Sequence, residues 1–226
     1  MPKKRQGWRF YLSPAEFPVY EVPCDLHIAM STPKVLLQLD CDPQPSVFDG
    51  VVAVDAGIDH LFRHAGIEAT QARELVHGAM FTRGPDQLQN TAIFIGGSDV
   101  SSCESLLAEV KQCFFGPLRV SVMMDANGCN STAAAAVLSA GRHIDLNGAR
   151  ALVLAATGPV GQRVTRLLAK AGARTLAASR SLDRANAVCD LVREKLSDAD
   201  VSGVSFYDRE SLTKSIEGVD VLIAAG

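Results

Sequence analysis

The stretch "LVLAATGPVGQRV", residues 152–164, constrains the fold more than any other part of the sequence. An apolar strand leads into a turn with spaced glycines, and a helix opens directly after it. Gly158 and Gly161 hold the second and third positions of a G-x-G-x-x-G turn, and Ala156 stands in the first. Pro159 suits the first turn of the helix, where its missing N–H costs little. A strand, turn and helix of this kind predict the phosphate-binding start of a Rossmann unit.

The alanine is acceptable in this turn under one condition. A methyl group fits the bend if the backbone of Ala156 does not need a positive φ, which glycine adopts freely. The helix N-terminus then faces the phosphates of a dinucleotide. The predicted cofactor-binding residues are Ala156, Thr157, Gly158, Pro159, Val160, Gly161, Ser179, Arg180, Arg184, Ala225 and Gly226.

The end of the next strand distinguishes NADP from NAD. An acid about 20 residues beyond the turn would hold the ribose 2′-hydroxyl of NAD, whereas an arginine would accept the 2′-phosphate of NADP. Here the strand "RTLAA" runs into Ser179 and Arg180, and no acid occurs before Asp183. Arg184 adds a second cation. NADP is therefore the expected cofactor, and NAD is the alternative.

Strands and helices alternate along the chain, which is typical of an α/β fold with mainly parallel sheets. We predict an extension over residues 1–29, an α/β substrate domain over 30–130, a linker helix over 131–146 and a C-terminally incomplete Rossmann NAD(P)-binding domain over 147–226. The predicted strands cover residues 34–40, 91–97, 118–125, 149–155, 175–178, 204–207 and 219–224, and helices cover 47–54, 69–81, 101–115, 159–171, 183–196 and 209–216. Side chains favoured at helix starts predict two caps, at Ser101 or Ser102 and at Asn130 or Ser131.

Composition excludes several kinds of partner and site. The 226 residues are 47% hydrophobic and 21% charged, as in a folded globular protein, and the net charge of −3 with no basic run argues against nucleic acid. No apolar run is long enough to span a membrane. Six cysteines without a C-x-x-C pair indicate a reduced, cytoplasmic protein with no metal site. His60 and His64 are expected on a solvated helix face rather than as metal ligands.

Several loops, taken in order, resemble a known family of enzymes. The segments are "LDCDPQPSVFDGVVAVDAGIDH", "FTRG", "TAIFIGG", "FFGPLRVSVMMDANGCNSTAAAA" and "LAATGPVGQRVTRLLAKAGA". Together they resemble the NAD(P)-dependent methylene-tetrahydromethanopterin dehydrogenases, bacterial one-carbon enzymes with relatives that act on methylene-tetrahydrofolate. The resemblance covers residues 31–226 and places Met30 where members of that family begin, so Met30 is an alternative start.

The resemblance implies a two-domain subunit that binds a pterin between its domains and works in formaldehyde oxidation. It implies hydride transfer from 5,10-methylene-tetrahydromethanopterin to NADP+ or NAD+, which yields the 5,10-methenyl form. The carbon that loses the hydride lies between two nitrogens whose lone pairs stabilise the cation, so positioning and electrostatics suffice for catalysis. The resemblance also implies a homo-oligomer, with a trimer among the options, and no nucleic-acid or membrane partner.

The resemblance also directs attention to polar residues of the first domain. Asp49 is the expected catalytic residue, because a nearby carboxylate favours the methenyl cation. The expected substrate-binding residues are Asp40, Asp42, Ser46, Phe48, Thr82, Arg83, Asn127, Asn130 and Thr132. Carboxylates and amides can hydrogen-bond to the aminopyrimidone edge, and an aromatic ring can stack on the pterin. Turn-forming or capping roles are the alternative for Asp42, Ser46 and Asn130.

Two departures from the family pattern lead to a further expectation. Ala156 replaces the glycine of the family's A-G-T-G-P-V-G, and the sequence ends at "VDVLIAAG", where relatives continue. We therefore expect weak or absent activity from this 226-residue form. Alternatives are a methylene-tetrahydrofolate dehydrogenase and an NADP-binding module without turnover. A different two-domain dehydrogenase is disfavoured, because Lys34 and Lys111 do not lie in polar loops at strand ends.

Overall fold

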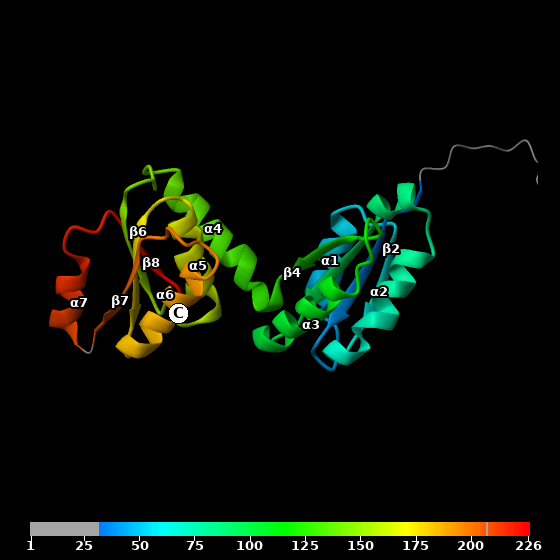
Figure 1. Cartoon of the computed structure of the whole chain (residues 1–226), viewed down its shortest axis with the longest axis horizontal. Helices are drawn as coiled ribbons and strands as arrows, with labels where there is room; N and C mark the ends of the chain where they lie inside the picture. Colours follow the sequence, from blue (N-terminus) through cyan, green and yellow to red (C-terminus); the bar gives the residue numbers. More distant parts are fainter. Residues whose placement is uncertain (1–31, 207) are drawn as a thin grey trace, which may run out of the picture. The chain divides into compact units, whose positions relative to one another are not determined.

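The computed structural model of the chain describes residues 32–206 and 208–226, whose helices and strands are drawn in Figure 1. Its strands are β1 (Val35–Asp40), β2 (His60–His64), β3 (Thr91–Gly96), β4 (Ser121–Met124), β5 (Arg150–Leu154), β6 (Arg174–Ser179), β7 (Val201–Ser205) and β8 (Val221–Ala224). They form two sheets with the orders β2-β1-β3-β4 and β7-β6-β5-β8, and all neighbouring strands are parallel. The α/β class is therefore confirmed, and the second order is that of a Rossmann half.

The helices around the first sheet leave its carboxyl edge open to loops. They are α1 (Val47–Asp55), α2 (Ala72–Phe81) and α3 (Val100–Gln112), with short 3-10 turns at Ala69–Gln71, Pro85–Asn90 and Ala126–Gly128. α1 and α2 lie on opposite faces of the sheet (Figure 1). Leu39 of β1, Ile95 of β3, and Leu106 and Val110 of α3 are fully buried in one core. Burial of this apolar face fixes which strand residues point toward helices and which point away.

The helices of the second half are α4 (Cys129–Gly141), α5 (Pro159–Lys170), α6 (Leu182–Arg193) and α7 (Arg209–Ile216). α5 and α6 pack against the strands of the second sheet, and α4 packs along α5. The core of this half includes the fully buried Val153, Val164 and Leu168, and Ala133 of the alanine-rich α4 lies in the same cluster. Small side chains on α4 allow its backbone to approach α5 closely. The described residues, 32–206 and 208–226, belong to one compact unit, so the predicted domain limits stay a prediction. The extension 1–29 and Met30 lie outside the described residues.

The edge strand β2 is a correction to the prediction. His60 and His64 lie on this strand rather than on a helix, and they pair with Val35 and Leu39 of β1. The segment is only five residues long and both of its ends are histidines, so its period-2 pattern is weak. The backbone hydrogen bonds that define β2 come from its pairing with β1, and the local sequence does not reveal this pairing.

Both predicted helix caps are also corrected. Asp99 begins α3, and its carboxylate accepts hydrogen bonds from the Ser101 amide at 2.9 Å and the Ser102 hydroxyl at 2.7 Å. α4 begins after its cap residue Gly128, whose φ is +63° and which has no side chain to bond to the helix. The predicted serines lie inside the first turns, because carboxylates earlier in the chain accept their hydrogen bonds: Asp99 from the Ser101 amide and the Ser102 hydroxyl, and Asp125 from the Ser131 amide.

None of the helices in the part of the chain that the structure describes has both the length and the apolar character needed to cross a bilayer.

Candidate functional site

A cavity of about 270 Å³ lies where β1, β3 and β4 end, and we call it the carboxyl-end cavity. Loops after parallel strands meet at one edge of a sheet, which is where ligands bind in open α/β folds. The lining residues are Asp42, Ser46, Phe48, Asp49, Gly97, Ser98, Asp125, Asn127 and Gly128. The structure thus brings together five of the residues that the sequence predicted for substrate binding and catalysis, namely Asp42, Ser46, Phe48, Asp49 and Asn127.

Asp40 has a different place from the predicted one. It is fully buried, and its carboxylate accepts hydrogen bonds from the backbone amides of Asp42 at 3.0 Å and Ser46 at 2.9 Å. Gln38, which is 1% exposed, donates to the same carboxylate from its side-chain amide at 3.4 Å. Since these donors use both oxygens, Asp40 shapes the loop that follows β1 and does not line the cavity.

Asp42 and Ser46 combine a local structural role with a place in the lining. The Asp42 carboxylate accepts hydrogen bonds from the Ser98 amide at 3.0 Å and the Ser98 hydroxyl at 2.8 Å. The Ser46 hydroxyl caps α1 by accepting from the amide of Asp49 at 3.2 Å. Ser46 therefore has the capping role that the sequence left open, whereas the Asp42 side chain ties the loop after β1 to the loop after β3, and both residues line the cavity.

Asp49 and Phe48 are presented by the first turn of α1. The pKa of Asp49 is raised, mainly because burial disfavours the charged form, and the carboxylates of Asp40 and Asp125 act in the same direction. The Ser46 hydroxyl and the Arg63 guanidinium oppose that rise. The Phe48 ring is 76% exposed and belongs to neither apolar core, so it is available to stack on a planar ligand.

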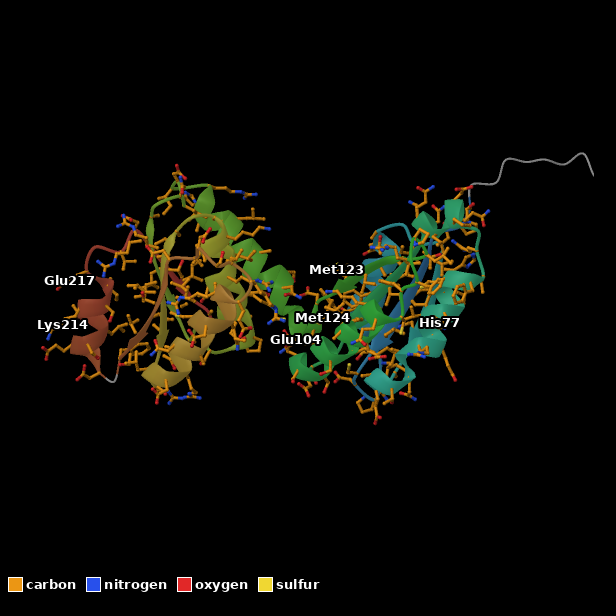
Figure 2. The ribbon with its side chains drawn as sticks, viewed as in Figure 1. His77, Glu104, Met123, Met124, Lys214 and Glu217 are labelled. Carbon is orange, nitrogen blue, oxygen red and sulfur yellow. The ribbon has the colours of Figure 1, made fainter. Side chains whose placement is uncertain are left out.

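Asn130 and Thr132 follow the cavity on α4 without lining it. The Asn130 side-chain amide donates to the carbonyl of Met124 at 2.6 Å, and its oxygen accepts from Nε of Arg163. Arg163 in turn pairs with Glu104 on α3 at 2.7 Å; Glu104 and Met124 are labelled in Figure 2. These bonds commit the Asn130 side chain to holding α4, while Thr132 is exposed.

Thr82 and Arg83 lie apart from the other predicted residues, near the amino ends of β1 and β3. The Arg83 guanidinium donates to the carbonyls of Pro33 at 2.8 Å and Asn90 at 3.1 Å, and the Thr82 hydroxyl donates to the Gly78 carbonyl at 2.9 Å. Both side chains line a separate cavity of about 580 Å³ beside α2. The structure does not bring the "FTRG" segment to the carboxyl-end cavity.

The turn between β5 and α5 accepts an alanine in place of the first glycine. Ala156 is fully buried, and its amide donates to the carbonyl of Ala178 at 3.1 Å. The left-handed residue of the turn is the preceding one, Ala155, with φ +53°. The condition for an alanine at position 156 is therefore met, because the strained backbone lies one residue earlier.

Glycine occurs at positions 158 and 161 of the turn for two different structural reasons. A Cβ added at Gly161 would lie 2.7 Å from the Cα of Ala156, so helix and strand approach as closely as only glycine permits. A Cβ at Gly158 would have its nearest neighbour, the Ala155 carbonyl, at 3.5 Å, which leaves space in front of the helix N-terminus. After β8, the amide of Ala225 donates to Leu154 at 3.1 Å, which brings Ala225 and Gly226 beside the same turn.

Two arginines follow β6 on the side of the turn. Ser179, at the end of β6, is 5% exposed, and its hydroxyl accepts from the Ser181 amide at 3.3 Å. Arg180 and Arg184 are exposed, and neither guanidinium has a hydrogen-bond or ion-pair partner among the described residues. Both guanidinium groups are therefore available to bind an anion such as the 2′-phosphate of NADP, the cofactor that the sequence predicts.

Sequence reasoning missed four members of the cavity lining, namely Gly97, Ser98, Asp125 and Gly128. Gly97 and Ser98 directly follow β3, and Asp125 directly follows β4. Asp125 also accepts hydrogen bonds from the amides of Asn130 at 2.8 Å and Ser131 at 3.1 Å. The signal that could have found them is their position, because residues just after parallel strands share one edge.

No metal site accompanies these groups in the described ranges. Among residues 32–206 and 208–226, no group of three or more His, Cys, Asp or Glu side chains is placed to hold a metal ion.

Known proteins similar to the chain agree on one group of enzymes. A family model described as "Methylene-tetrahydromethanopterin dehydrogenase, N-terminal" matches residues 47–127. The "Bifunctional protein MdtA" of Methylorubrum extorquens is 41% identical over 197 residues, which are 85% of this chain and 67% of that protein. The "NAD(P)-dependent methylenetetrahydromethanopterin dehydrogenase" of the same organism is 28% identical over 80% of this chain and 63% of its own length. The chain thus spans about two thirds of the length of these relatives.

A solved structure supports the fold. The ligand-free form of 5-ketofructose reductase from a Gluconobacter strain superimposes with a TM-score of 0.51 at 15% identity, over 86% of this chain and 69% of that chain.

Alanine variants of the two glycines of the turn should differ, one in the stability of the protein and the other in cofactor binding. Gly161→Ala should destabilise the protein by about 1–3 kcal/mol, because the methyl group overlaps the backbone of the preceding turn. Gly158→Ala should change the free energy of unfolding by less than about 1 kcal/mol, yet it should weaken NADP+ binding at least tenfold. Urea unfolding and calorimetric titration measure the two effects. Equal losses of stability in both variants would contradict the assigned roles.

The raised pKa of Asp49 predicts a pH-dependent stability difference. A group whose pKa is higher in the folded state stabilises the protein below its unfolded pKa, near 3.8, and loses that contribution as pH rises through the folded value. Asp49→Asn should therefore gain stability relative to the wild type between pH 4 and pH 7. Urea unfolding midpoints across this range provide the measurement, with Asp55→Asn on the same helix as the control. A difference in stability between variant and wild type that stays constant across this pH range would show that the pKa of Asp49 is not raised in the folded protein.

Proposed function

Because this chain belongs to the methylene-tetrahydromethanopterin dehydrogenase family, a family of NAD(P)-dependent oxidoreductases, we propose that it oxidises 5,10-methylene-tetrahydromethanopterin with NADP+. The products are the 5,10-methenyl form and NADPH. The observation that carries the proposal is the carboxyl-end cavity, which gathers Asp42, Asp49 and Asp125 and has no cationic side chain in its lining. Such a cavity suits a substrate whose reacting carbon becomes cationic.

NADP fits the turn between β5 and α5 on three observations. Gly158 leaves space before the helix N-terminus, Gly161 permits the close approach of helix and strand, and Arg180 has no other partner in the described residues. The first-turn amides of α5, from Val160 onward, would bind the pyrophosphate, and Arg180 with Arg184 would bind the 2′-phosphate. When bound, the nicotinamide ring accepts the hydride. NAD is the alternative cofactor.

The cavity residues would bind and orient the pterin. Asp42 and Asn127 offer a carboxylate and an amide for the aminopyrimidone edge, and the exposed Phe48 offers an aromatic face. In its ionised form the Asp49 carboxylate stabilises the cation that forms when the hydride leaves. No residue has to take up a proton in this reaction, because the methylene carbon loses only a hydride and its nitrogen lone pairs compensate the charge.

The larger organisation belongs to the same proposal. We propose that residues 30–130 bind the pterin, that residues 131–146 link the domains and that residues 147–226 bind the nucleotide. The helix α4, over Cys129–Gly141, lies in the chain between the two sheets and supports this division. We also propose a homo-oligomer in a reducing, cytoplasmic compartment. The described cysteines are all free thiols, which is compatible with that compartment.

An assay with both carriers tests the reaction. The purified chain is mixed with methylene-tetrahydromethanopterin or methylene-tetrahydrofolate and with NADP+ or NAD+, and the methenyl absorbance is followed. We expect the largest rise with methylene-tetrahydromethanopterin and NADP+, and Asp49→Asn should lower kcat about tenfold or more, which corresponds to about 1.4 kcal/mol of lost cation stabilisation. Asp55→Asn, on the same helix but outside the cavity, serves as control. Binding of NADP+ without binding of either pterin would overturn the proposal in favour of a nucleotide-binding module.

The cofactor preference has its own variant. Arg180→Asp should weaken NADP+ binding about 10- to 100-fold, because a charge-assisted contact worth about 1.5–3 kcal/mol is replaced by repulsion. NAD+ lacks the 2′-phosphate, so its affinity should not fall. The matched control is Arg174→Asp, an exposed arginine at the opposite, amino end of the same strand β6. Undiminished NADP+ affinity in Arg180→Asp would contradict the proposed 2′-phosphate site.

A further inference from the structure

We propose that Arg63 and Gln38 are positioning residues that hold the loop after β1 in the shape required by the carboxyl-end cavity. This inference rests on the proposed function, since the shape matters for binding a pterin. Neither residue lines the cavity, and nothing in the sequence pattern singles them out. They act through Asp40 and Ser46, which connect them to the two residues that face the substrate, Asp42 and Asp49.

Arg63 joins the edge strand β2 to the end of the loop. Its Nε donates to the side-chain oxygen of Gln38 at 2.9 Å, and one Nη donates to the carbonyls of Pro45 at 2.9 Å and Ser46 at 2.7 Å. A guanidinium can serve these three acceptors at once because its donors are fixed in a planar fork. The bonds bridge residues that are 17 to 25 positions apart in the sequence. Arg63 therefore fixes the last two loop residues before α1.

Gln38 transmits this constraint to the buried carboxylate. Its side-chain nitrogen donates to Asp40 at 3.4 Å and to the Ser46 carbonyl at the same distance, while its oxygen accepts from Arg63. Gln38 and Asp40 are 1% and 0% exposed. A buried polar group left without its hydrogen-bond partner destabilises the fold. The Gln38 amide and the Asp40 carboxylate are therefore held in one relative geometry. The side-chain amide of Gln38 donates to Asp40 and accepts from Arg63 at once, which an ionised carboxylate at this position could not do.

The network ends at the two residues that face the cavity. Asp40 accepts from the amides of Asp42 and Ser46, and the Ser46 hydroxyl accepts from the amide of Asp49. Each link is a direct hydrogen bond of 2.9 to 3.2 Å. Rotation of the Ser46 peptide would therefore move the first turn of α1, and with it the Asp49 carboxylate and the Phe48 ring. Precise placement of such groups is what catalysis by positioning requires.

Gly50 supports the same assignment. It is buried on α1, and a Cβ at this position would lie 3.2 Å from Cζ of Arg63. The helix thus rests directly on the guanidinium plane, which an ammonium on a flexible stem would not reproduce. Arg63 is also the cation that counteracts the rise of the Asp49 pKa caused by burial and neighbouring carboxylates.

The test compares Arg63→Lys with Arg174→Lys. Arg174 is an exposed arginine whose Nε and one Nη both donate to a backbone carbonyl, that of Gly148, so it matches the chemistry outside this network. Each full chain is titrated with methenyl-tetrahydromethanopterin and with NADP+, and amide hydrogen exchange is measured without ligand. In Arg63→Lys we expect exchange of the Ser46 amide to rise at least tenfold and the pterin Kd to rise about tenfold. The Kd for NADP+ should stay within twofold, and Arg174→Lys should change neither Kd.

A second variant keeps the test decisive if Arg63→Lys is poorly stable. Gln38→Glu retains an acceptor for Arg63 but places a carboxylate against Asp40, so the same loop amides should exchange faster while the pterin Kd rises. Unchanged exchange at Ser46 in both variants, or an unchanged pterin Kd despite faster exchange, would overturn the positioning role. Failure of the wild-type chain to bind any pterin would instead overturn the proposed function, and the inference with it.

Discussion

The buried carboxylate of Asp40 is the interaction on which the candidate site depends most. A carboxylate without solvent is unfavourable unless its oxygens are satisfied, and here the amides of Asp42 and Ser46 satisfy them directly. The loop between these amides can close around Asp40 in only a few ways. The start of α1 is fixed by that closure, because Ser46 is both a donor to Asp40 and the cap of the helix. The position of Asp49 follows from the burial of Asp40.

One geometric rule generates both halves of the site. Neighbouring strands in both sheets are parallel, so every loop that follows a strand emerges at the same edge of its sheet. In the first sheet this edge collects carboxylates, an amide and an exposed aromatic ring. In the second sheet it collects a helix N-terminus, two glycines and two arginines without partners in the described residues. The first set suits a planar polar substrate with a developing positive charge, and the second suits a dinucleotide phosphate.

The sequence was sufficient for the features that local chemistry determines. The turn around Gly158 and Gly161 could be recognised because strand, turn and helix are contiguous, and the condition on Ala156 could be stated before the backbone was known. The resemblance also identified Asp42, Ser46 and Asn127, which lie in polar loops after predicted strands. Helix and strand bounds were close to those observed wherever the apolar pattern was long.

The remaining features depend on contacts between distant residues. β2 has five residues and is recognisable only through its pairing with β1. Asp40 is the last residue of β1 and is a buried anchor, whereas Asp42 lies in the bend after the strand and lines the cavity, and no local pattern in the sequence separates these two roles. Thr82 and Arg83 were linked to the site by resemblance alone, and their hydrogen bonds lie at the amino edge. Long-range bonds such as that from Arg63 to Gln38 leave no periodic signal.

The most direct test of the central claim is a hydrogen-exchange map of the purified chain with and without methenyl-tetrahydromethanopterin. If the carboxyl-end cavity binds the pterin, slower exchange should be confined to residues 42–49, 97–98 and 125–128, the loops that form its lining. Adding NADP+ should protect residues 156–161 and 179–184 separately. Pterin-dependent protection around Pro33 and Arg83 at the opposite edge, with no change at residues 42–49, would contradict the account.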